Sequence, residues 1–224
     1  MRSIEKLISE ELGKRGFQKK GKPYLFRVEN DIIVVLAFER ASLTYIWFAL
    51  IPLFLPSPGF VYLTYGNRLS ALYKNVKALK KDAEQDTVVE MCMAMIQHLD
   101  NELLPLANKL SNANNLCAYI QEDLDTPPGL REGFLSCTPD KKMRLLMYGL
   151  LFLKRYDEAL NASERYYKQL KTKTMYTKEL TAKLLGECEQ IIALITSKKY
   201  HEIELLINQN VRDNLTLFLN NLGE

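Results

Sequence analysis

The sequence predicts an α+β protein: an N-terminal helix plus a four-stranded antiparallel sheet, followed by an all-helical C-terminal half of antiparallel helical hairpins. Three observations lead to this fold class. Apolar residues recur at helical spacing over residues 3–15, and four short runs over residues 24–65 are rich in β-branched and aromatic side chains. Helical spacing then returns after residue 68 and continues to residue 222.

The first helix is predicted over residues 3–15. Glycines at positions 13 and 16 end it, and the basic residues Lys14 and Arg15 stand near the negative end of its dipole. Its apolar stripe consists of Ile4, Leu7, Ile8 and Leu12. We expect this stripe to cover one face of the sheet.

The strands follow one another with short connections. Parallel strands need long crossovers, so this spacing favours an antiparallel meander. The four predicted strands are Tyr24–Val28, Ile32–Glu39, Thr44–Phe54 and Phe60–Tyr65.

No charged residue occurs from Ala41 to Asn67, which raises the question of a membrane span. A spanning helix needs about 20 mostly apolar residues, and prolines at 52, 56 and 58 interrupt this stretch. Two strands buried on both faces explain it better, with one face against the helical half or a second subunit. We therefore expect no membrane partner.

The remaining chain reads as a series of helices. Two prolines and a glycine at positions 127–129 form the clearest linker. We divide the chain into an α+β module (1–80), connecting helices (81–125) and a helical hairpin domain (130–224). The predicted helices span residues 68–80, 87–104, 112–124, 138–153, 157–171, 177–196 and 200–222.

Two helix connections resemble each other 44 residues apart, at residues 154–159 and 198–203. The first connection and its flanking residues look like part of a tetratricopeptide helical hairpin, in which small and aromatic residues let two helices pack closely. The likeness is incomplete, because Ser163 stands where an aromatic residue is expected. Hairpins are predicted, and true repeats are a weaker hypothesis.

Cysteine usage and the N-terminus indicate a cytoplasmic protein, and the charge is distributed unevenly along the chain. Residues 1–80 hold 13 basic against 6 acidic residues, although the whole chain carries only +3. Such asymmetry marks either an acidic partner or two halves that attract each other, and the second is the commoner case. The four cysteines are scattered, which is typical of reduced buried thiols, and the N-terminus has no apolar signal core.

The motifs tested for chemistry point to no cofactor, metal or catalytic residue. Residues 16–22 satisfy G-x-x-x-x-G-K, but Pro23 replaces the Ser or Thr that holds magnesium, and the loop runs from a helix into a strand. His98 and His201 are the only histidines, and neither neighbours a nucleophile motif. Zinc sites need clustered ligands, which the four cysteines do not provide.

Two residue sets remain as candidate binding surfaces. A basic patch could contact nucleic acid, but the small total charge makes a solvated turn the favoured interpretation. Four aromatic residues alternate along the third and fourth predicted strands, where they either pack in the core or form a partner-binding surface. The basic patch is Lys14, Arg15, Lys19, Lys20 and Lys22, and the aromatic set is Tyr45, Trp47, Tyr62 and Tyr65.

The run from Gly16 through Phe17, Gly21 and Tyr24 to Arg27, with the strand at 34–42, resembles an uncharacterised bacterial family known only as a domain of unknown function. The resemblance covers roughly the first 70 residues and implies a helix, a GF-x-K-x-G turn and antiparallel strands. It implies no catalytic residues. Some small α+β bacterial proteins of this general look serve as toxin-immunity partners, which is analogy at the level of fold.

Three functions follow in order of preference. The first is a non-enzymatic protein-protein interaction module, immunity-like in one form, whose partner is another protein or a second copy of this chain. The second is an enzyme with an unrecognised site between the two halves, where pockets tend to form. The third is a nucleic-acid binder that uses the basic turn over residues 14–22.

Overall fold

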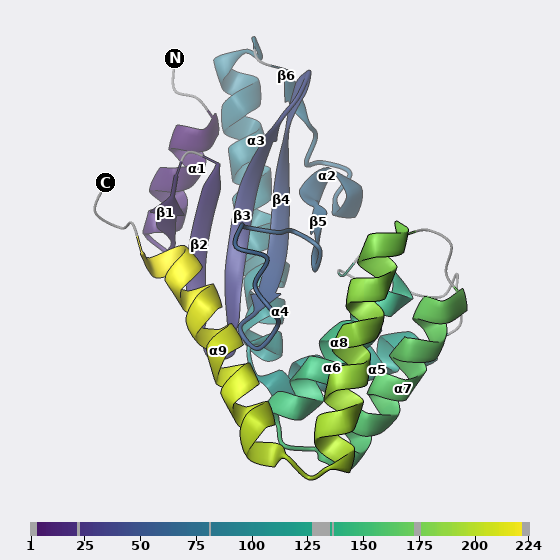
Figure 1. Cartoon of the computed structure of the whole chain (residues 1–224). Helices are drawn as coiled ribbons and strands as arrows, with labels where there is room; N and C mark the ends of the chain where they lie inside the picture. Colours follow the sequence, from purple (N-terminus) through teal and green to yellow (C-terminus); the bar gives the residue numbers. More distant parts are fainter. Residues whose placement is uncertain are drawn as a thin grey trace.

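An antiparallel sheet organises the first half of the chain in the computed structural model, which describes residues 4–21, 23–80, 82–126, 135, 137–172 and 176–220 (Figure 1). The strands pair in the order β1-β2-β3-β4-β5, and β6 pairs with the start of β4. Their bounds are β1 Gln18–Lys20, β2 Tyr24–Glu29, β3 Ile32–Arg40, β4 Leu43–Pro52, β5 Gly66–Arg68 and β6 Leu79–Lys80.

The α+β fold class and the first three predicted strands are confirmed, but the strand predicted at Phe60–Tyr65 is wrong. Those residues form a loop, and only Gly66–Arg68 pairs with β4. The apolar alternation that predicted a strand reflects packing, because Tyr62 and its neighbours lie against a buried cluster without ladder pairing. A Cβ on Gly66 would lie 2.3 Å from the carbonyl oxygen of Phe48, so glycine lets this strand approach β4.

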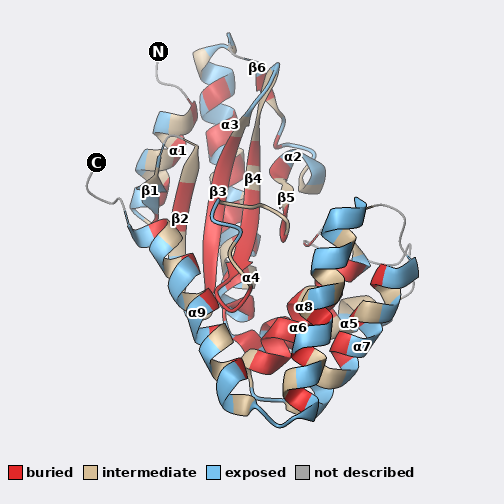
Figure 2. Cartoon of the chain, in the orientation of Figure 1, coloured by how far each residue is buried: buried red, intermediate tan, exposed pale blue. Residues whose placement is uncertain are grey.

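Both faces of the sheet are buried along β3. Alternate residues such as Val34 and Leu36 join the large core under α1 (Ile4–Gly13) and α3 (Gln85–His98). The residues between them, Ile33 and Val35, pack in a second cluster with Phe218 of α9 (Tyr200–Leu219). Because both faces of the sheet are covered, the strands can be apolar on both sides, as the uncharged stretch of the sequence predicted (Figure 2). The helical half covers one of these faces.

The helices beyond the sheet follow the prediction with two exceptions, one of which is the unpredicted helix α4 (Leu104–Leu110). The helix predicted over residues 68–80 is wrong, because Tyr73 is extended after a single turn and the chain then enters β6. A π-turn carries the chain from α3 into α4 before Pro105, whose missing N–H would break a regular helix. The other bounds are α2 Leu69–Leu72, η1 Leu99–Leu103, α4 Leu104–Leu110, α5 Ala113–Asp125, α6 Pro139–Phe152, α7 Tyr156–Thr172 and α8 Lys178–Thr196.

Helices α6 to α9 form two antiparallel hairpins whose turns share one geometry, as the sequence echo indicated. Lys154 and Lys198 both have positive φ, 59° and 54°. In each turn this residue donates to the carbonyl three positions back, and the next residue donates to the carbonyl five positions back, which is the Schellman motif. Tyr156 and Tyr200, two residues after each lysine, stack with their centroids 4.2 Å apart.

Helix α9 returns from the helical half and packs on the sheet (Figure 1). The buried side chain of Asn214 donates to the carbonyls of Leu53 (2.9 Å) and Leu55 (2.7 Å), and Asn210 donates to Phe54 (3.0 Å). These bonds fasten the C-terminal helix to the chain segment that leaves β4.

One large buried core contains residues from all three segments of the predicted division, so packing is continuous from α1 to α9. The division itself stays a prediction, and residues 127–129 of the expected linker lie outside the described residues. Across the described ranges, no helix combines the length and apolar character that crossing a membrane requires.

Candidate functional site

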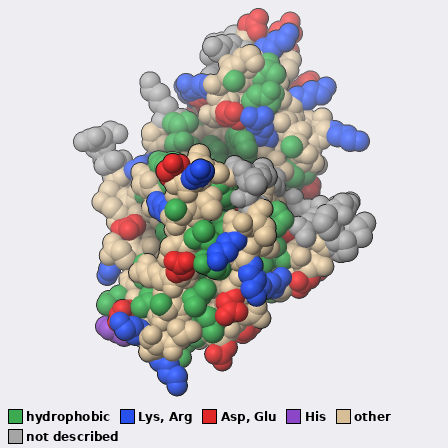
Figure 3. Space-filling model, turned by 45° about the vertical axis from the view of Figure 1, so that its right-hand side comes forward, with side chains coloured by type: hydrophobic (Ala, Val, Ile, Leu, Met, Phe, Trp, Pro, Cys, Tyr) green, Lys and Arg blue, Asp and Glu red, His purple; other side chains and the backbone are tan. Residues whose placement is uncertain are grey.

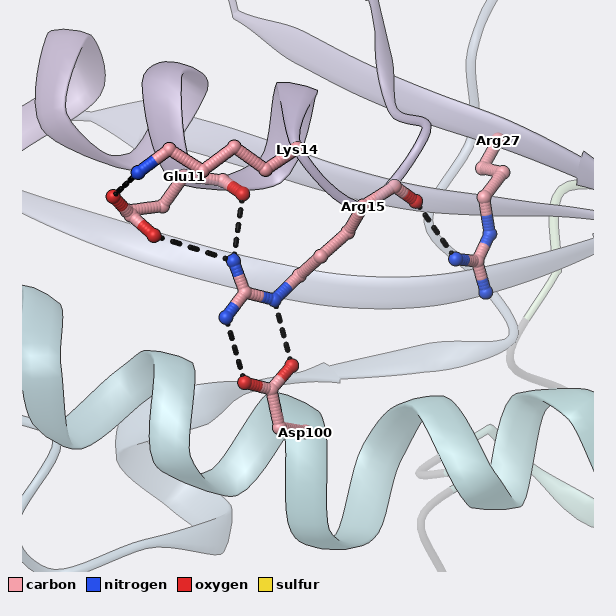
Figure 4. Close-up of polar contacts among 5 residues, drawn as sticks. All are labelled: Glu11, Lys14, Arg15, Arg27 and Asp100. Atoms are coloured by element: carbon pink, nitrogen blue, oxygen red, sulfur yellow. Dashed lines mark hydrogen bonds and ion pairs between the residues drawn. The ribbon is translucent and has the colours of Figure 1, made fainter.

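The basic turn over residues 14–22 is largely paired with acidic and carbonyl oxygens (Figure 4). The Arg15 guanidinium donates from Nε and Nη2 to the two carboxylate oxygens of Asp100, at 2.7 Å each. It also donates to the backbone carbonyl of Glu11 at 2.7 Å. Lys14 pairs with the Glu11 carboxylate at 2.5 Å. The hydrogen bond and charge of Arg15 lower the pKa of Asp100.

The other members of the predicted patch are spread out. Lys20 donates from Nζ to the backbone carbonyl of Asn220 at 2.6 Å, so it caps the end of α9. Lys19 is exposed on β1, and Lys22 lies outside the described residues. Much of the positive charge is therefore compensated locally, which weakens the electrostatic case for nucleic acid.

The predicted aromatic surface divides into two groups. Tyr45 and Trp47 lie half-buried on β4, and the guanidinium of Arg68 sits over both rings at 4.3 and 5.4 Å. The Trp47 indole N–H donates to Glu39 at 2.6 Å, and Arg68 donates to the same carboxylate at 2.7 and 3.0 Å. The bond from Trp47, followed by those from Arg68, lowers the pKa of Glu39. The polar groups of this set are satisfied by one another.

Tyr62 and Tyr65 instead lie between the sheet half and the helical half. Their rings meet edge to face at 6.4 Å, and the Tyr65 hydroxyl donates to the Lys141 carbonyl at 3.2 Å. Nearby, Arg144 of α6 forms two hydrogen bonds with Glu187 of α8, at 2.8 and 3.0 Å. In Figure 3 the surface is hollowed between the upper and lower parts of the molecule, and hydrophobic side chains border the hollow.

In this cluster of Tyr62, Tyr65 and Arg144 between the two halves, the tyrosines are held neutral beside an ion pair. Burial raises the pKa of Tyr62 and Tyr65 above the ordinary value, so both phenols stay protonated at neutral pH. Burial opposes the charge of Arg144, but the hydrogen bonds and charge of Glu187 outweigh it and raise the Arg144 pKa. The Tyr62 hydroxyl is buried and has no hydrogen-bond partner within the described ranges. The cluster can donate hydrogen bonds, and its guanidinium is already occupied.

A groove of about 750 Å³ runs between α1 and α3 on the opposite side of the sheet from α9. Leu7 of α1 and Val89, Cys92 and Ile96 of α3 give it an apolar surface, and Met93 lies beside them with 68% of its surface exposed. Large exposed apolar side chains gathered in a groove mark interaction sites more often than scattered ones do.

This groove was not predicted from the sequence. The buried face of α3 contains Val88, Cys92 and Met95, which recur at helical spacing. The available signal was the pair Val89 and Met93, which are apolar but lie one turn apart on the outer side of that helix.

The surroundings of His98 and of the cysteines are those of residues with a structural role. His98 is hydrogen-bonded through its two ring nitrogens to Glu102 and Asn75, each at 2.8 Å, and stacks on Tyr73 at 3.7 Å. All four cysteines are free thiols, and burial raises the pKa of Cys117 to about 12. Within the described residues, no group of three or more His, Cys, Asp or Glu side chains could hold a metal ion.

Comparison of the chain with protein-family models, with curated proteins and with solved structures finds no match. The resemblance of the first 70 residues to a bacterial domain of unknown function therefore stays a prediction. Any functional proposal has to rest on the geometry of the chain itself.

Proposed function

We propose that the protein is a non-enzymatic protein-binding module that receives an amphipathic helix of its partner in the groove between α1 and α3. The observation that carries this proposal is the exposed apolar surface of the groove, centred on Met93. Amphipathic helices are commonly recognised in this way, with apolar anchors at successive turns lying in a hydrophobic groove.

The apolar groups support a helix rather than a small polar ligand. Val89 and Met93 lie one turn apart on α3, with 38% and 68% of their surfaces exposed. Leu7 of α1 faces them across the groove. Methionine side chains adapt to different partner surfaces because the thioether chain is flexible and polarisable.

Charge supports a partner with basic residues beside its apolar stripe. Asp86 and Glu90 are exposed on the first two turns of α3, and neither makes an ion pair within the described part of the chain. Lys14 at the other edge of the groove is already paired with Glu11. Complementary potentials raise association rates and suppress wrong partners. An immunity-type role is one form of this function, in which the partner is a toxin.

Site-specific photo-crosslinking tests the proposal. A photoreactive amino acid replaces Met93, and a matched control chain carries it at Leu205, which is 51% exposed on α9. In cells of the source organism, we expect one protein to crosslink at Met93 and not at Leu205. The captured protein is then purified, and its affinity for the unlabelled chain is measured by calorimetry.

Point variants decide whether the groove is the binding surface. Val89→Asp and Met93→Asp place charge on exposed positions, so the fold should survive and the affinity should fall at least about tenfold. Leu205→Asp is the control and should bind normally. Equal crosslinking at both positions, or an unchanged affinity of the Met93→Asp variant, would contradict the proposal.

A further inference from the structure

A pocket of about 330 Å³ lies in the helical half between α5 and α7. Leu146 and Leu150 of α6 form part of its lining, with Ala118 of α5 and Ala162 of α7 beside them. Helix α6 packs against both neighbours, so the small side chains of the flanking helices leave room above it. This volume is at the lower end of the range for small-molecule sites.

Two guanidinium groups line the polar side of this pocket. Arg155 donates from Nε and Nη2 to the Glu158 carboxylate at 2.7 and 2.5 Å, which fixes its position. Arg165 is exposed and forms no hydrogen bond or ion pair in the part of the chain that the structure describes. It lies two turns after Glu158 on α7, so both project from the same side of the helix.

The net charge of the pocket favours a ligand with a single negative charge. Arg155, Arg165 and Glu158 together carry one net positive charge, which matches a carboxylate better than a doubly charged phosphate. A guanidinium binds a carboxylate through two parallel hydrogen bonds, and Arg165 has its donors available for such a pair. The amides of Gln121 and Asn161 also line the pocket.

The apolar lining requires that the ligand also carry hydrocarbon. Leu146, Leu150 and the two alanines offer contacts that a small inorganic anion cannot use. We propose that this pocket binds an amphiphilic monocarboxylate, with the carboxylate on Arg165 and a short hydrocarbon tail over α6. This site shares no lining residue with the groove between α1 and α3.

Hexanoate and its neutral analogue hexanamide are the probes that test this site. Each is titrated into the full-length ¹⁵N-labelled protein, and amide shifts are followed by NMR. We expect hexanoate to cause saturable shifts in α5 and α7. Hexanamide should bind at least about tenfold more weakly than hexanoate. Equal binding of the two probes, or shifts scattered over exposed lysines without saturation, would overturn the proposal.

Two variants separate the charge from the cavity. Arg165→Gln should weaken hexanoate about tenfold and leave hexanamide unchanged, because only the charged pair is lost. Ala118→Trp enters the pocket from an exposed position and should block hexanoate without removing charge. Arg212→Gln, which removes an exposed arginine from α9, is the control and should bind normally. Circular dichroism checks that each variant is folded, and unchanged hexanoate binding by Arg165→Gln would refute the assignment.

Discussion

The attachment of α9 to the sheet depends on Asn214, and its replacement by leucine tests how much this attachment contributes to stability. The side chain is fully buried and donates two hydrogen bonds, to the carbonyls of Leu53 and Leu55. Leucine has the same branched shape but no donor and is somewhat larger, so Asn214→Leu removes both hydrogen bonds and also adds bulk at a buried position.

The expected loss follows from those two bonds. Each neutral hydrogen bond contributes about 1 kcal/mol net, and each buried carbonyl left without its donor costs about 1 kcal/mol more. The accepting residues Leu53 and Leu55 are 5% and 0% exposed, so water reaches the carbonyls poorly. The Asn214 Oδ1 is buried and has no hydrogen-bond partner among the described residues, so its removal offsets part of this loss. We therefore expect the free energy of unfolding to fall by about 1–3 kcal/mol.

Urea unfolding measures this change with two probes. Fluorescence of Trp47, the only tryptophan, reports on the sheet, and far-ultraviolet circular dichroism reports mainly on the helices. Coincident transitions license a two-state treatment. Asn208→Leu, at an exposed position on α9, is the control and should change stability by less than about 0.5 kcal/mol. A loss below about 0.5 kcal/mol for Asn214→Leu would show that these bonds do not fasten the helix.

Three further predictions concern packing, a turn and an ion pair. Gly149→Ala should destabilise the protein by about 1–3 kcal/mol, because the new Cβ would lie 2.4 Å from the Cys117 sulfur. In a double-mutant cycle, Cys117→Ala should restore part of this lost stability. If the two losses simply add, the contact is contradicted. Lys198→Gly should raise the free energy of unfolding by about 1 kcal/mol, because the native φ of 54° strains a residue with a side chain and not glycine. Lys198→Ala keeps this strain and should not raise the free energy of unfolding. Thermal melts compare the two variants with wild type. Asp100→Asn should cost about 0.5–1 kcal/mol at pH 7, since the pair with Arg15 is partly exposed. The folded pKa of Asp100 is lowered, so this contribution is complete above the unfolded value of 3.8 and disappears as pH falls through the folded value. A difference from wild type that persists in acid would show another cause.

Local patterns predicted most of the helical architecture because each helix carries its own signals. The helices predicted over residues 138–153 and 177–196 begin at Pro139 and Lys178, within one residue of the prediction. The strand expected at Phe60–Tyr65 failed because alternation reports which side chains are buried and not whether a neighbouring strand accepts the backbone bonds. Those bonds depend on β4, which is distant in the sequence.

The candidate sites likewise depend on contacts between residues that are distant in the sequence, which local patterns do not predict. Residue type predicted that the basic turn would be solvated, and spacing on α1 could have indicated the pair of Lys14 with Glu11. The pair of Arg15 with Asp100 joins residues 85 positions apart, so no local pattern contains it. The separation of Tyr45 from Tyr65 likewise depends on the loop after β4, which turns the second pair of aromatic residues toward α6.

The two proposed binding sites fail or succeed separately because they lie in different layers of the fold. The groove belongs to α1 and α3 under the sheet, and the pocket belongs to α5, α6 and α7. Met93→Asp should therefore retain hexanoate binding, and Arg165→Gln should retain the partner protein. Sites without shared contacts give additive effects, so a variant that lost both activities would indicate damage to the common core rather than to either surface.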